Sequence, residues 1–298
     1  MLDINDFENS YQIIKQAIKE DWWSQRIEII RKEKRKILNE LAFFPTIDKI
    51  ISQHIENSYR TDYETYFPEF VNNNNDNDNN DDNDNKKQKT YCFIHSCNLK
   101  ETGLHMLNQL LFRLINSNAI QHFDKIFVVN IGLKIDANTV FNDKIKIINY
   151  SDDPLLYEMP TINLIRSFCE YNANCKILYL HTKGILHNHP KCVNDWIEMM
   201  LYFLVDKSSK CLELLDKYDT VGCNYTVWPI IPKHYSGNFW WANGNYIKLL
   251  KKIPDGSFRH AAEWWLLSTS NSVNSYNIHS SNIDHYKEEY PSSCYKTL

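Results

Sequence analysis

The chain has 298 residues, 43% of them hydrophobic and 13% aromatic, which is the composition of a protein that folds around a core. Its formal net charge of -4 lacks the basic excess that a nucleic-acid backbone requires, so we expect no nucleic-acid partner. No stretch approaches the roughly 20 apolar residues of a membrane span, and the acidic, polar start Met1–Asp6 is not a signal peptide. The expected location is therefore the cytoplasm.

The first 71 residues show helical spacing. A first amphipathic helix is predicted by apolar residues three or four apart, namely Phe7, Tyr11, Ile14 and Ile18. Similar spacing predicts further helices within 27–41 and 47–55. The basic run Arg31–Lys36 favours a solvated helix face, with contact to an acidic partner or a membrane surface as the alternative. We interpret residues 1–71 as a helical accessory or dimerisation region and expect a homo-oligomer through these helices.

A linker follows this region. Residues 72–85 are almost entirely Asn and Asp, which offer nothing to bury, so a disordered linker is predicted over 72–90. The remaining residues, 91–298, form the predicted main domain.

In this domain short apolar segments alternate with helical patterns. Strands are predicted at 91–95, 125–130, 144–149 and 176–180. Helices are predicted at 104–114, 160–168, 196–203 and 211–218, the last capped by Ser208 or Ser209. The β-α-β-β-α-β order predicts an α/β fold whose mainly parallel sheet lies between helices. Ligands then belong at the carboxyl ends of the strands.

Several common site motifs are absent. The seven glycines are too dispersed for GxGxxG or a P-loop, and neither GxSxG nor HExxH occurs. The eight cysteines form no CxxC pair, which favours reduced, buried thiols over a zinc site or a disulfide framework. Dinucleotide dehydrogenases and P-loop NTPases are therefore disfavoured.

Two segments combine residue types that suit ligand binding. One is YLHTKG at Tyr179–Gly184, where polar residues follow an apolar strand. The other is HYSGNFWWA at His234–Ala242, where aromatic rings can stack on sugars while Ser236 and Asn238 bond hydroxyls. The alternatives are a strand-end turn with a solvated Lys183 and an aromatic core strand.

These two segments resemble motifs of a group of GT-A-type glycosyltransferases of bacteria and large DNA viruses. The resemblance covers residues 91–298 and implies a GT-A fold and a nucleotide-sugar donor. It also implies a mixed sheet, a glycan, protein or small-molecule acceptor and, for a viral protein, a location in the virion or viral factory. GT-A enzymes hold Mn²⁺ or Mg²⁺ with an Asp-x-Asp motif, where this chain has His181-Thr182-Lys183. Metal dependence is therefore open, and metal independence is a second expectation.

The resemblance also implies residue roles. Glu263, in a predicted helix over 259–266, is the expected base of an inverting transfer, with an ion pair to Arg259 as the alternative. Lys183 is expected to offset leaving-group charge. The residues expected at the donor are His95, Ser96, Asp152, Asp153, Arg166, His181 and Thr182, with a turn cap as the alternative for the two aspartates. Those expected at the sugar or acceptor are His234, Ser236, Asn238, Trp240 and Trp241, and His285 is the expected metal ligand.

The hypothesis requires that His181–Lys183 and the aromatic hairpin after His234 converge on one cleft, with the indoles beside a cavity. Three alternatives stay open: a non-catalytic carbohydrate-binding or scaffold protein on a GT-A fold, a nucleotidyltransferase, and a protein whose N-terminal helices are the functional part. A nucleotidyltransferase normally needs a glycine-rich, basic loop near the first strand, and the sequence has none.

Overall fold

The computed structural model describes residues 7–20, 57–71, 88–99, 101–137, 142–183, 191–228, 231–254, 256–269 and 273–296. The chain divides into two units, Met1–Ser58 and Tyr59–Leu298. In the first unit, α1 spans Phe7–Lys19 and confirms the first predicted helix. The helices predicted within 27–41 and 47–55, the basic run and the Asn/Asp-rich segment lie outside the described residues.

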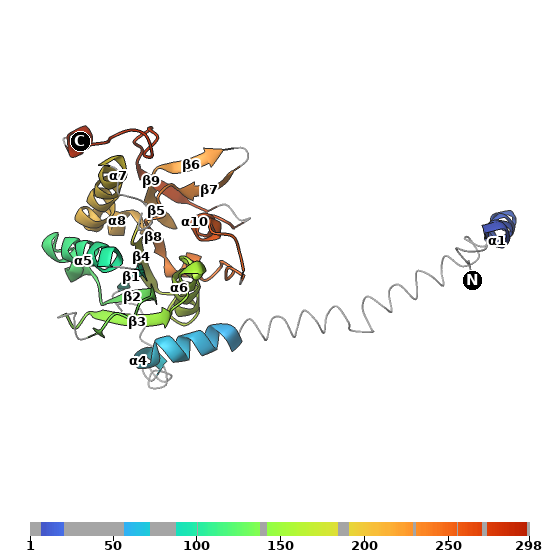
Figure 1. The fold of residues 1–298 in the computed structure, drawn as a ribbon, viewed down its shortest axis with the longest axis horizontal. Helices are drawn as coiled ribbons and strands as arrows, with labels where there is room; N and C mark the ends of the chain where they lie inside the picture. Colours follow the sequence, from blue (N-terminus) through green and yellow to red (C-terminus); the bar gives the residue numbers. More distant parts are fainter. Residues whose placement is uncertain are drawn as a thin grey trace. The chain divides into compact units, whose positions relative to one another are not determined.

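The second unit is built on a seven-stranded sheet in the order β3-β2-β1-β4-β8-β5-β9 (Figure 1). The strands are β1 Lys89–Asn98, β2 Lys125–Gly132, β3 Ile145–Ser151, β4 Cys175–His181, β5 Thr220–Cys223, β8 Trp240–Asn243 and β9 Ser275–His279. Strands β3, β2, β1 and β4 are parallel, whereas β8 runs antiparallel to β4 and β5, and β9 is parallel to β5. A separate hairpin pairs β6 (Tyr225–Trp228) with β7 (Ile231–Tyr235). The sheet is mixed and mainly parallel, as predicted.

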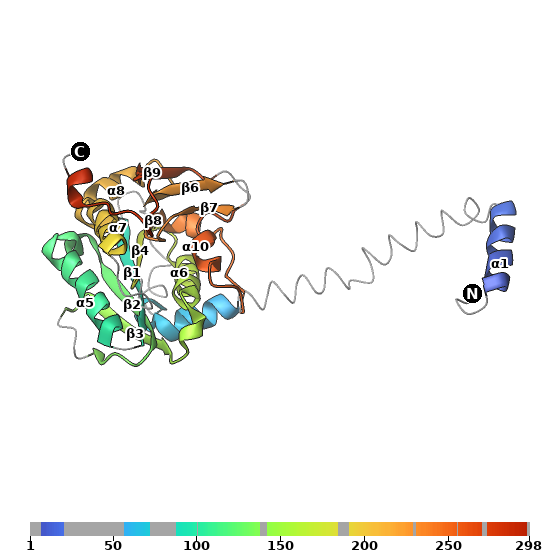
Figure 2. The same ribbon diagram turned by 45° about the horizontal axis from the view of Figure 1, so that its top comes forward.

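Helices cover both faces of this sheet (Figures 1 and 2). One face carries α5 (Glu101–Asn116), α7 (Lys191–Leu201) and α8 (Ser208–Leu214), and the other carries α6 (Met159–Tyr171), α9 (Gly244–Ile247) and α10 (Ala261–Trp265). Shorter helical turns are Ala119–His122, Pro154–Leu156 and Ser292–Cys294, with a π-turn at Tyr202–Asp206. Among the described helices, none is both long and apolar enough to cross a bilayer.

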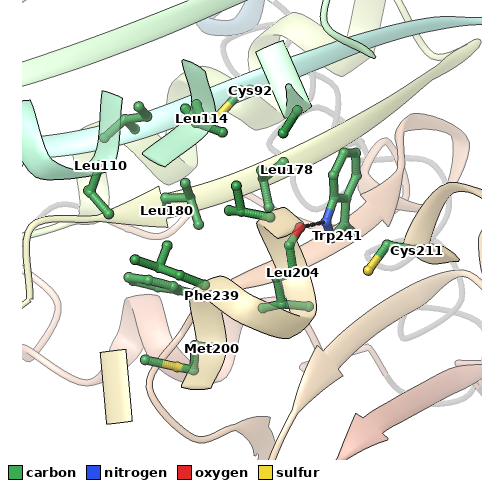
Figure 3. Packing of buried hydrophobic residues seen from close by; sticks show 14 of the residues in the cluster. Cys92, Leu110, Leu114, Leu178, Leu180, Met200, Leu204, Cys211, Phe239 and Trp241 are labelled. Atoms are coloured by element: carbon green, nitrogen blue, oxygen red, sulfur yellow. Dashed lines mark hydrogen bonds between the residues drawn. The ribbon is translucent and has the colours of Figure 1, made fainter. Parts of the chain in front are cut away.

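Two hydrophobic clusters flank the sheet because successive side chains of a strand point to opposite faces. Leu178 and Leu180 of β4 join the cluster under α5 and α7, together with Trp241 (Figure 3). Ile177 and Tyr179 join the cluster under α6 and α10. This burial on both faces explains why the central strands are continuously apolar.

The α/β unit begins earlier than the sequence predicted. Tyr63 and Phe67 are buried in the cluster under α6, and Phe67 packs edge-on against Phe127 with ring centroids 5.0 Å apart. Residues 59–66 are helical and α4 spans Pro68–Val71. The boundary predicted at residue 71 therefore moves to Ser58.

Three predicted ends also change. Ser208 is the first residue of α8, and the N-cap Lys207 makes no side-chain cap, so the predicted serine cap is wrong. The predicted helix over 259–266 begins only at Ala261. Lys89 and Thr90, which the predicted linker includes, belong to β1 instead.

Candidate functional site

A cavity of about 330 Å³ opens at the carboxyl ends of β1 and β4. The chain continues from β1 to β2 and β3 on one side of the sheet, whereas β4 lies on the other side of β1. Open α/β sheets bind ligands at such a reversal of strand order. The cavity therefore lies where the strand order predicted a ligand.

Two histidines form its floor. His95 and His181 are directly opposite each other on β1 and β4, and both line the cavity. Nδ1 of His95 lies 2.8 Å from Oγ1 of Thr161 in α6, and Nε2 of His181 lies 3.0 Å from the carbonyl oxygen of Gly237. Burial lowers the pKa of both imidazoles, that of His95 to about 4, against the opposing effect of Glu158. Both rings are therefore neutral at neutral pH.

The central carboxylate of the cavity is Glu158, which the sequence patterns did not single out. Its Oε2 accepts hydrogen bonds from the hydroxyl of Tyr179 at 2.7 Å and from Nδ2 of Asn238 at 2.6 Å. Burial raises the pKa of this carboxyl, but His181, His95, the Tyr179 hydrogen bond and Lys183 together hold it below its usual value.

The backbone before Glu158 is strained. Tyr157, which also lines the cavity, has φ 50° and ψ -140°. A non-glycine residue in such a region costs about 1–3 kcal/mol and is found most often at functional sites. No periodicity marks such a position, so the sequence patterns did not reveal it.

A tight turn after β7 joins the two sequence motifs. The amide of Asn238 donates to the carbonyl of Tyr235 at 3.0 Å, and Gly237 between them has φ 96°. The turn directs the backbone carbonyl of Gly237 at His181 and the side-chain amide of Asn238 at Glu158. The first condition of the hypothesis is therefore met, because His181–Lys183 and Asn238 line one cavity. The second condition fails, because both indoles are buried and neither lines that cavity.

Polar and cationic groups complete the walls. Oγ1 of Thr182 accepts from the amide of Cys97 at 3.1 Å, which leaves its own proton free to donate. The ammonium of Lys183 lies 4.1 Å from the ring centroid of Trp196. Burial lowers the pKa of Lys183, an effect that Glu263 and Glu158 oppose and Arg259 reinforces.

Glu263 lines the cavity as expected, from α10. Its side chain is 26% exposed, and its Oε2 lies 3.4 Å from Nδ1 of His260, within hydrogen-bond distance. Arg259 also lines the cavity but precedes the helix, so the two residues do not share a helix face.

Comparison with known proteins assigns the chain to a family. The family described as "Domain of unknown function (DUF8361)" matches residues 92–260. The chain belongs to this family. The match contains His95, Glu158, His181 and Asn238, whereas Glu263 lies beyond it.

No curated protein matches the chain. Among solved structures, it is similar to Rv0371c from Mycobacterium tuberculosis H37Rv, with 7% identity over 67% of this chain and 92% of that one, at a TM-score of 0.38. It is also similar to the Rv0371c homologue from Mycobacterium sp. strain JC1, with 12% identity over 65% and 87% of the two chains, at a TM-score of 0.35.

Within the DUF8361 domain, the indoles do not serve the cavity. Trp240 and Trp241 are 1% and 0% exposed, and neither lines the cavity. Trp241 stacks on Phe123 and donates its Nε1 hydrogen to the carbonyl of Leu204 at 2.8 Å. The expectation that they hold a sugar is corrected, because β8 lies inside the sheet between β4 and β5 and both of its faces are covered.

Two neighbours of the indoles are also placed away from the cavity. His234 is buried, and its Nδ1 lies 2.8 Å from the carbonyl of Pro232. Ser236 is part of the turn, and its amide donates to the carbonyl of Asn224 at 3.1 Å. Of the residues expected at the sugar, Asn238 alone lines the cavity.

Four residues expected at the donor lie elsewhere. Ser96 is buried, with no hydrogen-bond partner for Oγ in the described part of the chain. Asp152 is exposed, and Asp153 caps the turn Pro154–Leu156 by accepting from the amide of Leu155 at 2.9 Å. Arg166 is not at the cavity, because its guanidinium bonds the carbonyl of Leu250 and pairs with Glu170. Strand alternation accounts for Ser96, and the turn after β3 accounts for the two aspartates. The contacts of Arg166 with Leu250 and Glu170 hold it away from the cavity.

His285 is buried against α7. Its ring stacks on Trp196 with centroids 5.0 Å apart, and Nε2 lies 2.7 Å from Oγ of Ser281. In the ranges that the structure describes, no group of three or more His, Cys, Asp or Glu side chains is arranged to hold a metal. The next residue, Tyr286, lines the cavity with 65% of its surface exposed, and the sequence patterns missed it.

Proposed function

We propose that this DUF8361 protein is a glycosyltransferase that moves a sugar from a nucleotide-diphosphate donor to a hydroxyl group of an acceptor. The observation that carries the proposal is the lining of one cavity by Lys183, Thr182 and two carboxylates, Glu158 and Glu263. The GT-A fold is part of the proposal, supported by the two sequence motifs and by a mixed sheet with its cavity at the strand ends.

These groups suit both halves of the reaction. Departure of a nucleoside diphosphate leaves negative charge, which the Lys183 ammonium offsets while Thr182 donates a hydrogen bond. Arg259 adds a second positive charge at the cavity wall. Glu263 takes the proton of the acceptor hydroxyl, as the resemblance implies, so the expected outcome is inversion.

The end of β4 also adjoins a second hollow. This hollow of about 610 Å³ lies between α5 and α7 and shares His181, Thr182 and Lys183 with the first cavity. Donor and acceptor need adjoining spaces around the reacting atoms. The shared wall therefore supports a two-substrate reaction.

No step of the proposal passes through a metal. The end of β4 offers an imidazole, a hydroxyl and an ammonium, whereas Mn²⁺ and Mg²⁺ prefer carboxylate and other oxygen ligands. A protonated Lys183 also repels a cation in that place. The residues here do not fit the Asp-x-Asp type of metal site.

The test is a panel of UDP- and GDP-sugars, each with and without Mn²⁺, scored by thermal shift and by sugar transfer or donor hydrolysis. We expect a nucleotide-dependent shift and turnover that Lys183→Met abolishes. Sugar binding without nucleotide binding would support a carbohydrate-binding protein instead. No shift and no turnover with any donor would remove the proposal.

A further inference from the structure

The carboxylate of Glu158 has one oxygen left for a ligand. Oε2 already accepts two hydrogen bonds, from Tyr179 at 2.7 Å and Asn238 at 2.6 Å. Both donors are buried, and this fixes the plane of the carboxylate. The other oxygen, Oε1, lies 3.7 Å from Nδ1 of His181.

The hydrogen-bond partner of His181 decides which of its two ring nitrogens is unprotonated. Nε2 lies 3.0 Å from the carbonyl oxygen of Gly237. A carbonyl can only accept, so Nε2 carries the proton and Nδ1 of the neutral ring is an acceptor. Burial lowers the pKa of the imidazole, which agrees with a neutral ring.

Two acceptors therefore face each other across 3.7 Å, at the wall of the cavity. The side chain of Glu158 is 25% exposed and that of His181 8%, so a ligand that displaces water from the cavity must satisfy both acceptors, which needs two neighbouring donors. An ammonium group would meet repulsion from Lys183 and Arg259, which line the same cavity. Two adjacent hydroxyls on one ring carry no charge and can donate one hydrogen to each acceptor.

We propose that Glu158 Oε1 and His181 Nδ1 together bind a vicinal diol of the substrate. The inference rests on the proposed function, since that function brings a nucleotide sugar into the cavity. Two parts of such a substrate carry this chemistry, the ribose of the nucleotide and the hexose ring. No bond forms or breaks at the pair, so Glu158 acts in binding and leaves proton transfer to Glu263.

The first test changes the ligand and leaves the protein intact. Binding of UDP and GDP is measured by calorimetry beside their 2′-deoxy forms and the matching nucleotide sugars. If the pair holds the ribose, the 2′-deoxy nucleotide binds roughly ten- to hundredfold more weakly, as loss of a hydrogen bond to a charged group requires. If it holds the hexose, the 2′-deoxy form binds equally well, and only the nucleotide sugar loses affinity when Glu158 is changed.

The second test repeats these binding measurements with Glu158→Gln, so that the change in the protein and the change in the ligand can be compared singly and together. Gln places an amide hydrogen or a neutral oxygen at Oε1, so the variant should lose the preference for the diol, and removing both carboxylate and hydroxyl should cost no more than removing one. Glu170→Gln is the matched control, because Glu170 lies in helix α6, which Glu158 directly precedes, and it pairs with Arg166 and does not line the cavity. It should bind every ligand as the unmodified protein does.

Two failures are distinguishable. If no nucleotide or nucleotide sugar binds the unmodified protein, the proposed function falls and this inference falls with it. If they bind but Glu158→Gln weakens neither nucleotide nor nucleotide sugar, or weakens the deoxy and hydroxyl forms equally, the diol assignment is overturned while the proposed function stands.

Discussion

Nε2 of His181 donates a hydrogen bond to the carbonyl oxygen of Gly237 over 3.0 Å, although 56 residues separate them. This contact joins the end of a central parallel strand to the turn that leads into its antiparallel neighbour. It fixes the tautomer of the imidazole, and through Asn238 the same turn fixes the carboxylate of Glu158. Much of the site therefore depends on one turn.

The turn should tolerate no side chain at Gly237. An added Cβ would lie 2.5 Å from the sulfur of Met200, and the residue has φ 96°. Gly256 is the matched control, since its φ is 73° but nothing lies within 4 Å of an added Cβ. We expect Gly237→Ala to lower the free energy of unfolding by about 3 kcal/mol and Gly256→Ala by about 1 kcal/mol. Equal losses in urea titrations would mean that the packing at Met200 relaxes.

The indoles and the exposed tyrosine should behave in opposite ways. Trp241→Phe removes core volume and the hydrogen bond to Leu204, so we expect about 2 kcal/mol less stability and unchanged nucleotide affinity. Tyr286 is 65% exposed at the cavity, so Tyr286→Ala should change stability by less than about 1 kcal/mol yet weaken nucleotide-sugar binding. Calorimetry and denaturation of both variants check this. Loss of affinity in Trp241→Phe at full stability would return the indole to the binding site.

As the pH is raised, nucleotide affinity should begin to fall at a lower pH than it would with a solvated lysine at this position. Burial lowers the pKa of Lys183 below 10.5, so its ammonium loses charge at a lower pH than a solvated lysine would. Glu263 and Glu158 oppose this shift and Arg259 adds to it. Lys183→Arg keeps its charge across the range and should flatten the profile. A titration of UDP or GDP affinity from pH 7 to 10 measures the effect, and identical profiles for the two proteins would contradict the role of Lys183.

Stability should fall on mild acidification. The pKa of His95 drops from 6.5 to about 4 on folding, mainly through burial, with Glu158 opposing and His181 adding to the shift. Between these values the unfolded chain binds a proton that the folded protein does not, so stability is lost as the pH falls from 6.5 to 4, by about 3 kcal/mol at most. Urea titrations at pH 7, 5.5 and 4.5 should show a shallower dependence for His95→Asn. The pKa of His285 shifts in the same direction, so part of the dependence should remain.

The sequence by itself determined the first four strands of the α/β unit and the main helices beside them. The strands at 91–95, 125–130, 144–149 and 176–180 and the helices between them were predicted because burial on both faces or on one face leaves a local periodicity. The location of a ligand site at the strand ends followed from their order. Lys183, His181 and Asn238 were selected because polar residues directly follow or interrupt apolar segments there.

Only the tertiary structure decided which side chains meet. Trp240 and Trp241 looked like a binding surface because no local pattern reveals that their strand lies between β4 and β5, where both faces are covered. Glu158 was missed because its role depends on a strained backbone at Tyr157 and on contacts with Tyr179 and Asn238, which are 21 and 80 residues away. Periodicity records how much of a residue is buried, whereas a site depends on distances between residues far apart in the chain, and these are fixed only when the strands take their register.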